Sequence, residues 1–192
     1  MNNINYIQAL KNAAKFHKVH EMVYPVLEDD RFAHWSGSGK DVHHHYGDGG
    51  LLRHTLEVVD FCQVIVEQHN GNCTDNNNRI NHKELFISAV WHDYGKIWDY
   101  QKVDGVWGKH DSHARQIHHI TRSAMEFEKH YDCNTLPECN KDNIIHNILS
   151  HHGCREYGSP VSPATREAWV LHLADNLSAR LDDCNKHDRF SS

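Results

Sequence analysis

The sequence has no apolar run of roughly 18 residues, and its N-terminal segment MNNINYIQALKNAAKFHK lacks the long apolar core and cleavage site of a signal peptide. These absences exclude a transmembrane helix and predict a cytoplasmic protein that needs no membrane. An excess of positive charge is also missing, because 20 Lys and Arg stand against 26 Asp and Glu, for a net charge of −6. Since non-specific binding to nucleic acid requires neutralised phosphates, a general nucleic-acid coat protein is disfavoured. A local basic or metal-lined cleft remains compatible with this charge.

Pairs of cysteines in the CxxC arrangement are absent among the six cysteines, which argues against a zinc finger. Alternating Val, Ile and Tyr patterns typical of strands are nearly absent too, whereas apolar patterns with a period of about 3.6 residues recur. We therefore predict an all-α fold, a single compact helical bundle. The expected helices cover residues 4–20, 51–69, 81–93, 113–131, 141–151 and 163–182.

The length of 192 residues suits one domain with a substantial core. We expect residues 1–44 to form a helical extension and loop that pack on this core, residues 45–184 to form the main domain, and residues 185–192 to form a flexible tail. The Gly- and His-rich segment 34–50 is long for a loop, so it is a candidate lid or substrate loop. No obligatory protein partner is indicated, and the sequence leaves the oligomeric state open.

Histidine is abundant, at 20 of 192 residues, so position must decide which histidines are ligands. In AVWHDYGK, His92 and Asp93 follow apolar rows at the end of an expected helix, which Gly95 would terminate. The alternative for this pair is a hydrogen-bonded core contact. In GGLLRHTLEVV, His54 lies at the edge of an apolar stripe, where this segment alone favours an ordinary partly buried histidine over a ligand.

Two further segments place polar residues on apolar helical faces. In LHLADNLSAR, Asp175 interrupts an apolar stripe, and a buried carboxylate needs a cation, either a metal or a salt bridge to Arg180 or a nearby lysine. In ILSHHGCREYGSP, His151 and His152 end two neighbouring apolar rows, so both project from the buried side of one helix end. Two adjacent histidines reach the same metal only where the chain turns, and Gly153 provides that turn.

The order of these residues is more informative than any one of them. Over about residues 45–182, the segments HHHYGDGGLLRHT, HDYGK, ILSHHGCREYGSPVSPATREA and LHLADNLSAR together resemble the HD-domain metal-dependent phosphohydrolase superfamily. They are most similar to the HD domain of YhaM-type 3′→5′ exoribonucleases. The resemblance implies a helical HD domain with its metal site between the helices.

The resemblance also implies how two divalent transition-metal ions would be held. Four residues match the ligands of the first ion: His54, His92, Asp93 and Asp175. Asp93 would bridge to the second ion, whose other ligands match His151, His152 and one histidine of the intervening helix. The spacing typical of the family selects His119 for this role, whereas the apolar periodicity of that helix favours His113. Imidazole and carboxylate ligands suit Mn, Fe, Ni, Co or Zn, and spacing does not choose among them.

The implied chemistry is the cleavage of phosphate esters by a metal-activated hydroxide, with Asp93 and Lys96 as catalytic residues. Lys96 would also contact the substrate phosphate, unless it is an exposed lysine after the helix, and Ser159 and Arg180 are weaker substrate-binding candidates. The substrate would be a nucleotide or a short nucleic acid. YhaM-type enzymes carry an N-terminal OB-fold, whereas residues 1–33 are expected to be helical here, which favours small nucleotides or short oligonucleotide ends.

Several alternatives accompany the leading interpretation of a phosphohydrolase or phosphodiesterase. Within the same chemistry they are a 3′→5′ exonuclease on short RNA or single-stranded DNA and a phosphohydrolase of dNTPs or nucleoside monophosphates. An HD-type di-iron oxygenase is disfavoured by the adjacent histidines, His151 and His152. A non-catalytic nucleotide-binding HD module is disfavoured because degenerate modules usually lose ligands, and all ligand positions are filled here.

Overall fold

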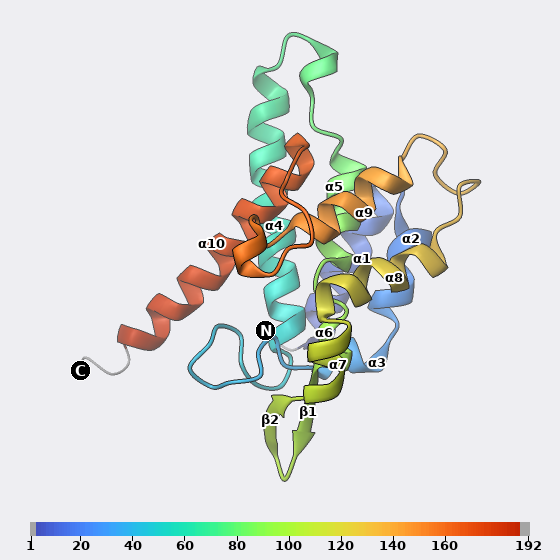
Figure 1. The fold of residues 1–192 in the computed structure, drawn as a ribbon. Helices are drawn as coiled ribbons and strands as arrows, with labels where there is room; N and C mark the ends of the chain where they lie inside the picture. Colours follow the sequence, from blue (N-terminus) through green and yellow to red (C-terminus); the bar gives the residue numbers. More distant parts are fainter. Residues whose placement is uncertain (1–2, 189–192) are drawn as a thin grey trace.

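The computed structural model describes residues 3–188, and helices form nearly all of its regular structure (Figure 1), which confirms the predicted all-α class. The long helix α4 (Gly50–Asn72) packs against α5 (His82–Trp91) and α10 (Arg166–Asp188). Helix α9 (Lys141–Ser150) packs against α5, α10 and α8 (His119–His130). These five helices surround a core of fully buried apolar side chains, whose removal from water is the main stabilising contribution to the fold. None of the described helices is both long enough and apolar enough to cross a membrane.

The N-terminal part of the chain folds into three short helices: α1 (Asn3–Phe16), α2 (His20–Leu27) and α3 (Asp30–His34). They pack on α4 and α5. The expected helix 4–20 ends early, since Lys18 has a φ of 59° and turns the chain into α2. At the other end, α10 runs to Asp188, and residues 189–192 of the expected tail lie outside the described residues.

The chain between α5 and α8 contains a β-hairpin that the sequence analysis missed. Helix α6 (Lys96–Asp99) leads into β1 (Tyr100–Val103) and β2 (Val106–Lys109), which pair antiparallel. The turn consists of Asp104 and Gly105, with φ values of 49° and 82°, and Asp-Gly is a preferred pair for such two-residue turns. The strands escaped detection because each has four residues and most of these are exposed, so no alternation of buried and exposed positions develops.

The expected helix 113–131 is divided into α7 (Asp111–Gln116) and α8. The break falls at His118, whose φ of 68° is unfavourable for a helical residue. The Asp99 carboxylate accepts a hydrogen bond from the first backbone N–H of α8, at 2.9 Å from His119 N. A side chain of the preceding segment therefore fixes where α8 begins, which apolar periodicity cannot reveal.

The loop over 35–49 forms a closed structure between α3 and α4. The two arms of the loop meet at a backbone hydrogen bond in which Gly37 N donates to His45 O at 2.9 Å. A Cβ atom on Gly50 would lie 1.9 Å from the same carbonyl oxygen, so only glycine fits where the loop enters α4. The hairpin supports the loop, because the Trp35 and Trp107 rings lie 4.9 Å apart. The loop is thus held beside the entrance to the centre of the bundle.

Candidate metal centre

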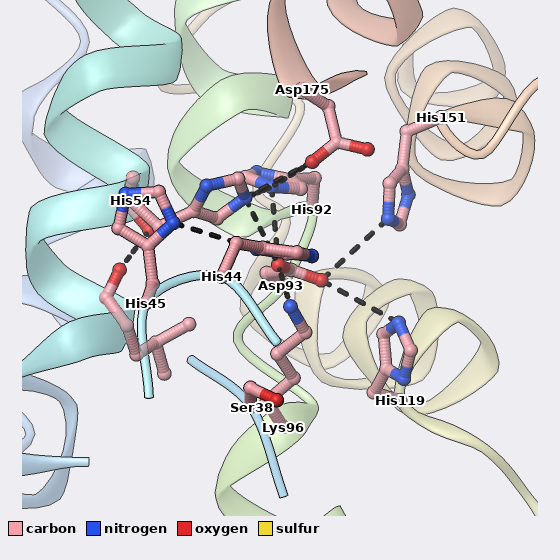
Figure 2. Close-up of polar contacts among 12 residues, drawn as sticks. Ser38, His44, His45, His54, His92, Asp93, Lys96, His119, His151 and Asp175 are labelled. Atoms are coloured by element: carbon pink, nitrogen blue, oxygen red, sulfur yellow. Dashed lines mark hydrogen bonds and ion pairs between the residues drawn. The ribbon is translucent and has the colours of Figure 1, made fainter. Parts of the chain in front are cut away.

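Seven His and Asp side chains predicted from the sequence converge at the centre of the bundle, at the ends or edges of five helices. They form two groups whose potential ligand atoms lie within 4.8 Å of one another, and Asp93 belongs to both. The first group is His54, His92, Asp93 and Asp175, and the second is Asp93, His119, His151 and His152. Figure 2 shows the Asp93 carboxylate between His54 on one side and His119 and His151 on the other.

The first group is buried, and among its members Asp175 is the most exposed. His54 Nε2 lies 3.0 Å from Asp175 Oδ1, 3.3 Å from Asp93 Oδ2 and 3.2 Å from His92 Nε2. Burial opposes the charged form of His54, but the two carboxylates outweigh it and raise the pKa of His54 to about 9. Burial likewise opposes ionisation of Asp175, and the neighbouring imidazoles reverse this and lower its pKa. The group therefore places two ionised carboxylates beside imidazole nitrogens, at a point where positive charge is favourable.

The second group shows the fit to a metal most directly. His119 Nε2 and His151 Nε2 lie 3.5 and 3.6 Å from Asp93 Oδ1, and within the described residues none of these three buried atoms has a hydrogen-bond partner. Burial lowers the pKa of His119 to about 3 and that of His152 to about 4, so both imidazoles are neutral at pH 7. Buried acceptors that face one another without a donor are unfavourable, and a divalent cation among them would satisfy all of them.

In three of the candidate ligands, His92, His151 and His152, the other ring nitrogen, Nδ1, forms a hydrogen bond to a backbone carbonyl. In His92 and His151, Nδ1 donates to the carbonyl oxygen three residues earlier, at 2.7 Å in both cases. In His152, Nδ1 donates to Tyr157 O at 2.9 Å. Because a carbonyl can only accept, Nδ1 carries a proton in each of these rings, which leaves Nε2 as the nitrogen that faces the centre. This is the arrangement found in metal-binding histidines, whose second nitrogen is held by the protein.

The orientation of His54 depends on a pair of side chains that the sequence analysis missed. His54 Nδ1 lies 3.0 Å from Ser178 Oγ, and Ser178 in turn donates to Glu57 Oε2 at 2.8 Å. Since the serine proton is directed to the carboxylate, the hydroxyl oxygen accepts from His54 Nδ1. Ser178 is one helical turn after Asp175, so α10 supplies both a candidate ligand and the support of another.

Asp99 organises the side of the centre that contains His119. Its Oδ2 accepts from His119 Nδ1 at 3.0 Å, and its Oδ1 accepts from His113 Nδ1 at 2.6 Å. His113, the alternative ligand favoured by periodicity, also accepts from Arg122 Nε at 3.0 Å and belongs to neither group. The structure thus brings His119 to the centre and places His113 behind Asp99. No local sequence signal identifies Asp99 as a supporting residue.

Lys96 lies inside the centre, so the alternative of an exposed lysine is wrong. Its side chain is 6% exposed and its Nζ is 2.5 Å from Asp93 Oδ2. Burial opposes the charge on Lys96, but Asp93 outweighs it and raises the pKa of the ammonium. Burial likewise disfavours ionised Asp93, whose pKa is nevertheless held well below its usual range by Lys96 and His92. Gly95, expected to end the helix, has an ordinary φ of −60° and is required instead because a Cβ would lie 2.1 Å from His119 O.

A cavity of about 230 Å³ opens beside Lys96, His119, His152 and Asp175. Its walls include part of the 35–49 loop, which supports the expectation that this segment covers the site. Residues that the sequence analysis did not select also line it: Lys40 and His44 from the loop, and Tyr100 and Lys109 from the hairpin. Their contribution depends on the tertiary position of the loop and hairpin, so no local pattern marks them.

Two of the substrate-binding candidates lie elsewhere. Ser159 is buried, with an Oγ that has no hydrogen-bond partner in the described part of the chain, and Arg180 is exposed on α10. Neither residue lines the cavity. Among the described residues, Arg180 forms no ion pair with Asp175, which contacts His54 and His92 instead.

The chain is similar in sequence to a known family and to known proteins. Residues 51–180 match the family model of the HD domain. Similar curated proteins include the 3′-5′ exoribonuclease YhaM of Bacillus subtilis (strain 168), 25% identical over 183 residues that cover 95% of this chain and 51% of the relative. The protein of the same name from Listeria welshimeri is 25% identical over 181 residues, 94% of this chain and 53% of its own. The protein of the same name from Bacillus pumilus is 28% identical over 154 residues, which cover 79% of this chain and 44% of the relative.

The chain spans about half the length of the curated relatives it matches. No solved structure shows a significant match. The match to the family model covers well over half of the chain and contains all seven residues of the centre. This chain therefore belongs to the HD domain family.

Proposed function

We propose that this chain is a metal-dependent phosphodiesterase that cleaves phosphate esters of nucleotides or of oligonucleotide ends, with a 3′ end of RNA as the leading substrate. The observation that carries the proposal is the pair of ligand groups that share the Asp93 carboxylate beside a lysine-lined cavity. The printed name of the relatives, 3′-5′ exoribonuclease, supports the choice of RNA ends.

The first ion would be bound by His54, His92, Asp93 and Asp175, and the second by Asp93, His119, His151 and His152. The mixture of imidazoles and carboxylates suits Mn, Fe, Co, Ni or Zn. When bound, two such ions lower the pKa of a water ligand and neutralise negative charge on a phosphoryl oxygen. The tautomers set by the Nδ1 contacts orient every Nε2 for this role.

The protein supplies further positive charge for the substrate. Lys96, charged and buried at the side of the cavity, would contact a non-bridging oxygen of the scissile phosphate. Lys40 and Lys109 line the same cavity from the loop and the hairpin, and within the described residues neither ammonium group forms an ion pair. We assign them to the phosphate of the neighbouring nucleotide, because a diester substrate carries a second negative charge one nucleotide away.

The direct test is a metal-supplemented hydrolysis screen over dNTPs, nucleoside monophosphates, cyclic dinucleotides and RNA oligonucleotides. Asp93→Asn should lower the rate on the preferred substrate by at least about 10³-fold, since the shared carboxylate contacts both proposed ions. Asp111→Asn is the matched control, because Asp111 is an exposed carboxylate at the start of α7. Full activity in Asp93→Asn would contradict the mechanism.

A mononucleotide phosphohydrolase is the second candidate, favoured by the small volume of the cavity, about 230 Å³. The variant Lys40→Glu/Lys109→Glu separates the two functions. A phosphodiesterase on oligonucleotides should lose at least tenfold in kcat/KM, whereas hydrolysis of a nucleoside monophosphate should change less. Equal losses on both substrates would favour the mononucleotide enzyme.

A further inference from the structure

Helix α10 presents an apolar stripe to solvent on the face opposite the metal centre. Trp169, Leu173, Leu177 and Leu181 are 51%, 55%, 45% and 47% exposed, and they follow one another at intervals of four residues. Residues four apart lie on one side of a helix, so the four side chains form a continuous ridge. Figure 1 shows α10 along one side of the molecule, with its C-terminal part extending away from the other helices.

The stripe is not needed to bury α10 against its own chain. The inner face of the helix already supplies Leu171, Ala174 and Ser178, all 0% exposed, and packs on α4, α5 and α9. Helices on the surface of monomers normally carry polar residues on the outer face. Four large apolar residues in a row there indicate a surface that is covered by another molecule.

We propose that the stripe binds a second copy of this chain, with the two α10 helices antiparallel and related by a two-fold axis near position 175. A regular ridge is symmetric about its midpoint, so reversing it produces the same surface. Leu173 then packs on the partner's Leu177, and Trp169 packs on the partner's Leu181. Such an isologous contact closes at two subunits and leaves no further copy of the stripe exposed.

The helix dipoles support the antiparallel direction. Antiparallel packing sets the positive N-terminal end of each α10 beside the negative C-terminal end of its partner. The charged side chains at the two ends are already engaged within their own chain, since Asp182 accepts from His45 N at 2.7 Å and Arg166 donates to Asn78 Oδ1 at 2.8 Å. Arg180 would lie near the partner's Trp169, within reach of a cation–π contact.

The available area matches that of a specific dimer. The four apolar side chains, each about half exposed, offer roughly 400 Å² per copy. The exposed flanking residues Arg166, Asn176, Arg180 and Cys184 bring this to about 800 Å² per copy, which is the size of a standard protein interface. A lipid surface is a poorer occupant, because membrane-surface helices are rich in Lys and Arg, whereas residues 166–184 contain two Arg against four Asp or Glu.

The test is the oligomeric state of the full chain, measured by sedimentation equilibrium between about 1 and 100 μM. The wild type should dimerise, and Leu173→Glu should weaken self-association at least 100-fold, since each dimer contains the altered contact twice. Val64→Glu is the matched control, because Val64 is 65% exposed on α4, and it should dimerise as the wild type does. Circular dichroism spectra of the variants check that the fold is retained.

A wild-type chain that is monomeric at 100 μM would overturn the proposal, and so would a Leu173→Glu variant that dimerises normally. A complex only with another protein of the cell would assign the stripe to a different partner and would equally reject the homodimer. Phosphodiesterase activity is measured separately, so a monomeric active enzyme would reject the dimer and leave the proposed function intact.

A short bismaleimide cross-linker tests the orientation of the helices. In an antiparallel pair the two copies of Cys184 lie about 27 Å apart at 1.5 Å of rise per residue, too far to be linked. An Arg166→Cys variant should link residue 166 to the partner's Cys184, as identified by peptide mass spectrometry. Linkage between two Cys184 residues in the wild type would instead indicate parallel helices and overturn the proposed geometry.

Discussion

Replacing Asp99 by asparagine should weaken the second metal site while leaving the first intact. The Asp99 carboxylate accepts hydrogen bonds from the Nδ1 and the backbone N–H of His119, at 3.0 and 2.9 Å. Asparagine has the same shape, but it lacks the negative charge and presents an N–H₂ group to one of these donors. His119 would then lose the contact that directs its Nε2 towards Asp93.

The expected magnitude follows from the ionisation of Asp99. Burial opposes its charged form, yet the hydrogen bonds from His119 and His113 outweigh it and hold the pKa at about 2, against an ordinary 3.8. That difference corresponds to about 2 kcal/mol of the free energy of unfolding. Because the pKa is lowered in the folded state, this stabilisation is present above about pH 4 and is lost as the pH falls towards 2. Asp99→Asn should therefore lower stability at pH 7 by about 2 kcal/mol in a urea titration.

The effect on metal binding should be larger for one ion than for the other. Loss of an outer contact to a metal-binding histidine typically weakens affinity about 10- to 100-fold. In isothermal titration calorimetry with Mn²⁺, Asp99→Asn should show the lower affinity for the second ion and an unchanged affinity for the first. His113→Gln is the control, since it removes the other donor to Asp99 without touching His119. Unchanged affinity for the second ion in Asp99→Asn, or equal weakening of both ions, would refute the assigned role.

Three further predictions concern separate parts of the structure. His151→Gln should lower occupancy of the second ion, measured by elemental analysis, and leave the first occupied; equal loss of both would argue against two distinct sites. Gly50→Ala should destabilise by about 3 kcal/mol in a denaturant titration because its Cβ would lie 1.9 Å from His45 O, whereas Gly71→Ala, with open space around it, should be neutral or stabilising. If Gly50→Ala were as stable as the wild type, the backbone at His45 would have moved away from the added Cβ, and the predicted clash would be wrong. Asp29, which caps α3, has its pKa lowered by hydrogen bonds that outweigh burial, so Asp29→Asn should destabilise by about 1 kcal/mol at pH 7 and by less below about pH 4. A difference in the free energy of unfolding between Asp29→Asn and the wild type that did not change with pH would contradict this reasoning.

The positions that the sequence predicts well share one property. His54, His92, His151 and Asp175 lie on or directly after long apolar helical faces, and the period of the helix fixes the direction of their side chains. The apolar row and the His or Asp on it lie within a few residues of each other, so the local sequence contains the whole pattern. The convergence of the four helices, in contrast, comes from the resemblance to a known family and not from the periodicity itself.

The contacts that the sequence does not predict join residues far apart in the chain. Ser178 supports His54 across 124 positions, and Asp99 supports His119 across 20. Nothing in the neighbourhood of these residues distinguishes them from ordinary surface or capping residues. The periodicity of the segment 113–131 favours His113 for the same reason, because the break at His118 is imposed by a carboxylate outside that segment.

The candidate ligands are distributed over α4, α8 and α10 and the ends of α5 and α9. This distribution would make the lifetime of the protein in the cell depend on metal. Two bound ions would act as cross-links among all five helices. Each ion present at 100 times its dissociation constant adds about 2.7 kcal/mol to the free energy of unfolding. Metal starvation would then do more than stop turnover: the chain would open more often and become a better substrate for cellular proteases. The abundance of this protein would follow the free metal concentration of its surroundings.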